Sequence, residues 1–160
     1  MLTNNFNNDI CYQISPNNNS WGVKYRLYDG TLNDNAKGYA MASLRNFGTA
    51  NLDSNTQRSR IILGVGTTPT QATDYCLADE VSRTDYSLTS ASLGSTSADY
   101  DNKCTFTTTC QWNGSDGTEI SEVGILGNFS HLPLLFAREV LSTPIIVNNG
   151  DIFTVSIAIG

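Results

Sequence analysis

The sequence is poor in charge, in histidine and in long apolar runs, and each shortage excludes a class of protein. Only 15% of its 160 residues are charged, and nine Lys and Arg against fifteen Asp and Glu give a formal net charge of −6. Nucleic-acid-binding proteins usually carry a clustered basic patch, so we expect no nucleic-acid partner. No apolar run approaches the roughly 18 residues of a membrane-spanning helix, so we expect no membrane insertion either.

A secretion signal and a metal motif are missing as well. Residues 1–8 have neither the basic start nor the apolar core of a signal peptide. We therefore expect synthesis in a cytoplasm, where thiols stay reduced. No two cysteines form a Cys-x-x-Cys pair, so zinc is not expected. Buried, unpaired thiols fit this pattern, and a disulfide formed after lysis is the alternative; the four cysteines are Cys11, Cys76, Cys104 and Cys110.

The usual signatures of catalysis and cofactor binding are absent. The only histidine, His131, lies in a predicted loop, and no Gly-x-Ser-x-Gly motif marks a nucleophile. Residues 64–66, Gly-Val-Gly, follow a predicted strand but lack the remaining residues of a phosphate-binding loop, so we predict a tight turn there. Asp99, Asp101 and Asp116 lack the spacing of a calcium loop. We expect no enzyme activity, no metal and no cofactor.

What the chain does contain is the composition of a β-protein, rich in Thr, Ser, Asn and Gly. Apolar residues alternate with polar ones or form short continuous runs between turn residues. We predict an antiparallel β-sandwich or jelly-roll-like single domain over residues 21–160, after an irregular polar N-terminal arm at residues 1–20. The arm is either disordered or ordered against a neighbouring subunit. The predicted strands are residues 21–27, 60–65, 104–112, 120–126, 134–140, 144–147 and 152–159.

Several segments allow more than one structure. Residues 36–47 fit a helix or a strand, and residues 70–81 fit a short helix or an irregular crossover. Residues 85–103 fit a loop or a weak edge strand. Glycine-containing turns at residues 113–117 and 148–150 predict a hairpin connection and a type I′ turn, respectively.

Glu122 and Arg138 are the two charged residues that we single out. Each lies within an otherwise apolar predicted strand, where a lone charge is costly and a paired charge is tolerable. Adjacent antiparallel strands would place them side by side as an ion pair. Alternatively, each side chain points to solvent from one face of the sheet.

The last predicted strand, residues 152–159, gives a physical reason to expect assembly. It ends one residue before the end of the sequence, and an exposed apolar edge strand is an aggregation hazard. It must be paired inside the sheet, capped by the chain's own loops, or covered by another subunit.

The order and spacing of several short motifs resemble a recurring pattern in small β-rich structural proteins of tailed bacteriophage virions. The resemblance covers residues 60–160. Its motifs are Gly-x-Gly-Thr-Thr-Pro at residues 64–69, Asp-x-x-Leu at 74–77, Glu-Val-Gly-Ile at 122–125, Leu-Phe-Ala-Arg at 135–138, and Pro-Ile at 144–145 before the Gly-Asp turn and terminal strand.

The resemblance implies a virion protein that acts through its surfaces. We expect an auxiliary capsid protein, of the decoration or cement type, that binds the major capsid protein lattice and copies of itself as a homotrimer. The alternative is a tail-fibre or baseplate component, or a module that adheres to host glycans through Trp21, Trp112 and the tyrosines. A glycan-active enzyme would need two facing exposed carboxylates, whereas the acidic residues here fall mostly in turns.

Overall fold

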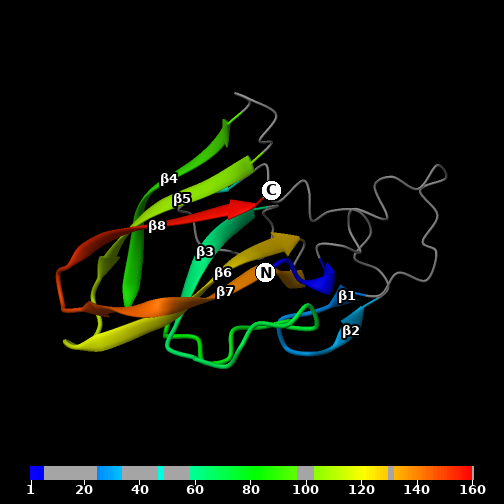
Figure 1. Ribbon diagram of the computed structural model, residues 1–160, viewed down its shortest axis with the longest axis horizontal. Coiled ribbons are helices and arrows are strands. Elements are labelled where there is room, and N and C mark those ends of the chain that lie inside the picture. The colour runs from blue at the N-terminus through cyan, green and yellow to red at the C-terminus, as the bar shows by residue number, and fades with distance from the viewer. Residues whose placement is uncertain (6–24, 34–46, 49–57, 97–102, 130–131, 160) are drawn as a thin grey trace.

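The computed structural model describes residues 1–5, 25–33, 47–48, 58–96, 103–129 and 132–159. These residues form two three-stranded antiparallel sheets packed as a sandwich (Figure 1), which confirms the predicted all-β class. The strands are β1 (Tyr25–Arg26), β2 (Leu32–Asn33), β3 (Arg58–Gly64), β4 (Tyr86–Thr96), β5 (Lys103–Trp112), β6 (Thr118–Phe129), β7 (Leu132–Val147) and β8 (Ile152–Ile159).

We call β3-β6-β7 the first sheet and β4-β5-β8 the second sheet. The core lies between them, because the inner sides of both sheets are apolar. In the second sheet, the even positions of β5 point inward as the alternation predicts, and Phe106 and Trp112 are buried. They meet inward-facing residues of the first sheet in two clusters, which include Ile61, Leu63, Ile120, Val123, Ile125 and Phe136.

The first sheet is buried on its outer face too. Ile61, Ile62 and Leu63 of β3 are each 0% exposed, which agrees with the predicted strand buried on both sides. Ile62 packs against Leu77 in residues 65–85, which we call the covering loop. In Figure 1 this loop runs along the side of the first sheet away from the second sheet. A continuous apolar run on β3 is therefore needed to fill two interfaces.

A β-bulge in β7 sets which side chains face the covering loop. Ala137 pairs with Ile125 and Leu135 pairs with Leu126, so Phe136 is an extra residue without a partner on β6. Leu135 and Arg138 would point to opposite faces of a regular strand, since side chains alternate with period two. The bulge shifts this alternation by one residue. Leu135 and Arg138 therefore both point to the outer face, while Phe136 packs into the core.

Strand β7 corrects the prediction of two strands at residues 134–140 and 144–147. It is one strand of 16 residues. The predicted break coincides with a second irregularity, where residues 141–144 lie opposite the single residue Ser121. Pro144 has no N–H to donate to a ladder, and prolines inside sheets are confined to such irregularities or to edges.

The predicted hairpin connection at residues 113–117 is wrong. It joins β5 of the second sheet to β6 of the first, and residues 148–151 likewise carry the chain from β7 to β8 of the second sheet. The turn at 148–150 does form, with Gly150 at φ +91° and the Asp151 N–H donating to the Asn148 carbonyl at 2.9 Å. Crossing between sheets lets Trp112 and Ile120 face each other in one cluster.

The structure decides between the alternatives for two of the three ambiguous segments. Residues 86–96 form an edge strand, β4, which pairs with β5 along its length. Residues 70–81 are an irregular crossover, with Leu77 buried and Tyr75 and Val81 half-buried. No helix in the described part of the chain is long and apolar enough to cross a membrane.

Residues 1–3 of the predicted arm match neither of the two alternatives, which were disorder and order against a neighbouring subunit. Leu2 pairs with Ala137, and the Thr3 N–H donates to the Phe136 carbonyl at 2.9 Å, so residues 1–3 lie along the edge of β7 in the same chain. The remaining arm, residues 6–20, and the segments at 21–24 and 36–46 are outside the described residues.

Candidate functional site

A buried polar cluster lies between the outer face of the first sheet and the covering loop. We call it the Arg138 cluster: Arg138 on β7, Glu122 on β6, and Asp74 with the backbone of Thr68, Ala78 and Asp79 in the covering loop. The side chains of Arg138 and Glu122 are only 2% and 0% exposed. The structure thus brings together the two charged residues that the sequence singled out, and it adds partners from a third segment.

Arg138 is the centre of the cluster because its guanidinium group binds three partners. Nε donates to Glu122 Oε2 at 2.8 Å, and Nη1 donates to Asp74 Oδ2 at 2.8 Å. Nη2 donates to the carbonyl of Thr68 at 2.9 Å. Burial lowers the pKa of this guanidinium, but the hydrogen bonds to Asp74 and Glu122 outweigh it and raise the pKa above its usual value. Arg138 therefore stays charged and links the sheet to two points of the loop.

Glu122 fixes the far end of the loop through its other lone pairs. Oε1 accepts a hydrogen bond from the Asp79 N–H at 2.7 Å, and Oε2 accepts one from the Ala78 N–H at 3.2 Å. Together with Arg138, three donors reach this carboxylate. A buried carboxylate is tolerated only when it is paired and hydrogen-bonded in this way.

Two glycines make the space that Glu122 occupies. A methyl group on Gly66 would lie 2.5 Å from Glu122 Oε1, and one on Gly64 would lie 2.6 Å from the same atom. Neither glycine is among the described glycines with positive φ, which are Gly30, Gly117 and Gly150. The predicted tight turn at residues 64–66 is wrong, because Gly64 is still part of β3 and residues 65–66 form no turn. These glycines are required instead for the close approach of a carboxylate.

The middle of the covering loop is held by hydrogen bonds and apolar contact. Asp74 Oδ2 also accepts the Gln71 N–H at 2.8 Å, which closes a local turn before Leu77. The Leu77 N–H donates to the hydroxyl oxygen of Tyr28 at 3.2 Å. Burial raises the pKa of Tyr28 well above its usual range, so this hydroxyl is neutral at physiological pH. The loop is thus fixed along its whole length.

This geometry suits a structural clamp and not an acid–base site. A general acid or base must reach a substrate proton, yet Glu122 is fully buried and its lone pairs are taken by protein donors. Pairing with Arg138 also offsets the free-energy cost of burying the charge of Glu122. The cluster therefore positions residues 65–79 on the sheet.

Sequence reasoning found two members of the cluster and missed the others. Glu122 and Arg138 stood out because each interrupts an apolar strand. Asp74 lies in an irregular loop, where a carboxylate is unremarkable, and its partner is 64 residues away. The sequence feature that could have indicated the cluster is the pair Gly64 and Gly66. Glycines this close together can mark a position where another group, here the Glu122 carboxylate, approaches the backbone.

The other candidate residues give no second site in the described part of the chain. Cys76, Cys104 and Cys110 are free, and no group of three or more His, Cys, Asp or Glu residues that could hold a metal occurs among the described residues. Trp112 is 1% exposed, and its indole N–H donates to the Ser115 carbonyl at 2.9 Å. Cys11, Trp21, Asp99, Asp101 and His131 are outside the described residues.

No protein-family model, curated protein or solved structure matches this chain. The resemblance to phage virion proteins therefore stays a prediction, and function must be inferred from the residues and their geometry.

Proposed function

We propose that this chain is a bacteriophage virion protein, an auxiliary capsid protein of the decoration or cement type. It binds the major capsid protein lattice, associates with copies of itself, and stabilises the head without catalysis and without a cofactor. It is made in the host cytoplasm and resides in the virion.

The observation that supports this proposal is where the motifs of the resemblance lie. Residues 64–69 and 74–77 lie at the end of β3 and in the covering loop, and Glu122 and Arg138 come from the two strands beneath it. Four short motifs that are scattered along the sequence thus meet in one buried cluster. These motifs thus attach the covering loop to the first sheet of the sandwich. A structural role of this kind suits a protein that functions by packing and assembly.

The runner-up, a tail or baseplate component that adheres to host glycans, has less support. Stacking on a sugar needs an exposed aromatic face. Trp112 is in the core, and Tyr25 and Tyr86 are buried as well. Among the described tryptophans and tyrosines, only the half-buried Tyr28 and Tyr75 remain for that role.

Quantitative mass spectrometry of purified virions tests the proposal. We expect the chain at a copy number comparable with that of the major capsid protein. Particles assembled without the chain should recover that copy number when purified chain is added, and should become more resistant to heat. A copy number that is a small fraction of the capsid protein's would favour the tail location instead. Absence from virions, or failure of the chain to bind particles, would overturn the proposal.

A further inference from the structure

In the described part of the chain, the two edge strands of the second sheet, β4 and β8, carry little of the usual protection; the exception is a β-bulge in β4 at Thr89. In the described part of the chain, no segment pairs with the outer edge of β4 or of β8. Natural proteins guard such edges with charged residues, proline or covering segments. Neither β4 (YSLTSASLGST) nor β8 (IFTVSIAI) contains a charged residue or a proline. No described segment therefore keeps another strand from pairing with either edge.

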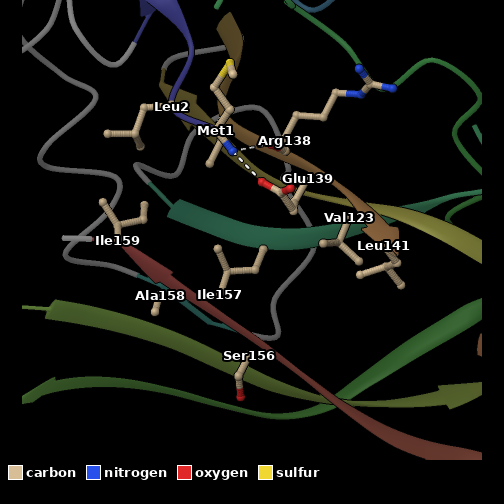
Figure 2. Close-up of a pocket in the computed structure, with 11 residues that line it drawn as sticks. Met1, Leu2, Val123, Arg138, Glu139, Leu141, Ser156, Ile157, Ala158 and Ile159 are labelled. Atoms are coloured by element: carbon tan, nitrogen blue, oxygen red, sulfur yellow. Dashed lines mark hydrogen bonds and ion pairs between the residues drawn. The ribbon is translucent and has the colours of Figure 1, made fainter. Parts of the chain in front are cut away.

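A cavity of about 310 Å³ lies beside the free edge of β8, where the two sheets separate. Figure 2 shows side chains from both sheets turned toward it, with Ile157 and Ile159 from β8 opposite Leu2, Val123 and Leu141. Its wall is mainly apolar, with the ion pair between the Met1 amino group and Glu139 (2.7 Å) on one side. An added strand at β8 would direct alternate side chains into this space.

The other free edge presents a side chain that fits this cavity. Leu93 on β4 pairs with Phe106, whose side chain is in the core, so Leu93 points to the inner side of the second sheet. It is nevertheless 44% exposed, because it lies at the open edge. The molecule therefore has an exposed apolar side chain on one edge and an apolar cavity beside the opposite edge.

The register places these two features at the same level along the strands. Leu93 and Ile157 both pair with Phe106, so they lie in one cross-strand row. Strands β4 and β8 run in the same direction, because both are antiparallel to β5. If β4 of a second copy pairs with β8 without slippage along the strands, its Leu93 comes level with Ile157 at the cavity.

We propose that copies of this chain associate head to tail, with β4 of one copy pairing with β8 of the next and Leu93 entering the cavity beside β8. Charge favours a second copy as the occupant. The chain carries a net charge of −6, which opposes self-association at most of its surface. The two edge strands do not add to this repulsion, because neither β4 nor β8 contains a charged residue. Head-to-tail contacts can close into a ring.

Two single substitutions and their mixture test this arrangement by sedimentation velocity over a concentration series. Leu93→Asp damages only the β4 side of the contact, and Ile159→Asp, at a half-buried residue that points into the cavity from β8, damages only the β8 side. The unaltered chain should form a multimer of the 17.4-kDa protomer, and each variant alone should be a monomer. Mixed in equal amounts, the variants should form heterodimers, because one undamaged contact remains between them.

Leu32→Asp is the matched control, since Leu32 is 58% exposed on β2, away from both edges. It should keep the mass of the unaltered chain. A monomeric unaltered chain, variants that keep its mass, or a mixture that stays monomeric would each overturn the proposal. If circular dichroism shows that one of the two variants is unfolded, the mass of the other alone decides. This inference rests on the self-association in the proposed function, whereas binding to particles is measured separately; a monomeric chain that still binds particles would overturn only the head-to-tail contact.

Discussion

Among the described residues, segments lie over parts of both faces and both edges of the first sheet, whereas only one face of the second sheet is covered. Residues 1–3 lie along β7, and Phe47, Gly48 and Glu80 pair with β3 at the other edge. The covering loop closes the outer face through the Arg138 cluster. In the second sheet, by contrast, the outer face carries uncharged rows such as Ser92–Thr107–Ser156, and no described segment pairs with either edge.

This difference suggests that the first sheet determines the stability of the fold, whereas the second sheet is available for assembly. The first sheet contains the buried charges and the tightly packed glycines, so changes there should act on folding. The outer side of the second sheet contains small hydroxyl side chains whose hydrogen bonds stay within the sheet, such as Thr107 to Ser156 at 3.0 Å. Changes there should leave folding intact and act on contacts with other molecules.

The largest effect is expected from Arg138→Ala. The substitution leaves Glu122 and Asp74 without their cation at a buried site. Removing one partner of a buried ion pair typically costs about 3–5 kcal/mol. We expect a loss of this size in the free energy of unfolding, measured by urea denaturation. The covering loop should also become more susceptible to proteolysis, because Thr68 and Asp74 lose their attachment to the sheet.

Arg83→Ala is the control for this prediction. Arg83 pairs with Glu80 within the covering loop, but its side chain is 38% exposed. Exposed ion pairs contribute about 0.2–1 kcal/mol, so the loss should be several times smaller. Equal losses for the two variants would show that the buried cluster has no special role in stability.

The sequence predicts the strands far better than it predicts how they connect. Alternation at residues 104–112 and 152–159 identifies β5 and β8, because one buried face imposes a period of two. Turn residues at 113–117 report only local backbone preferences, and these do not specify which sheet the next strand joins. Glu122 and Arg138 could be predicted as a pair because each is a charged residue within an otherwise apolar strand. Asp74 could not, since its contact depends on the fold and on the bulge that turns Arg138 outward.

Gly66→Ala should give the next largest effect. Its methyl group would lie 2.5 Å from Glu122 Oε1 and 2.7 Å from Ala78 Cβ, with no free space to accept it. Overpacking of this kind typically costs about 1–3 kcal/mol. Gly94→Ala on β4 is the matched control, because a methyl group there has only the Thr105 carbonyl oxygen nearby, at 3.9 Å. Denaturation should show a clear loss at Gly66 and none at Gly94; a similar loss at both would contradict the difference between the sheets.

Cys110, on the face that the two sheets share, predicts a loss of stability at alkaline pH. Burial raises the pKa of this thiol from 9.0 to about 11. Between these values the unfolded chain releases the proton while the folded chain keeps it, so the free energy of unfolding falls as pH rises. We expect a contribution of about 1–2 kcal/mol. Cys110→Ala should weaken the fall between pH 9 and 11. The buried hydroxyls of Tyr28 and Tyr86, whose pKa values are also raised, remain in both proteins, and identical slopes would count against this origin.

The smallest effect on folding is expected from Thr154→Lys on the outer face of the second sheet. Thr154 is exposed, and its hydroxyl lies 3.4 Å from that of Thr109 at the limit of a hydrogen bond. Surface substitutions away from special features usually change stability by no more than about 0.5 kcal/mol. Urea denaturation should therefore show no measurable loss, unlike Arg138→Ala. If Thr154→Lys instead destabilised the isolated chain by more than Gly66→Ala, the outer face would be packed against part of the same chain, and the second sheet would be no more open than the first.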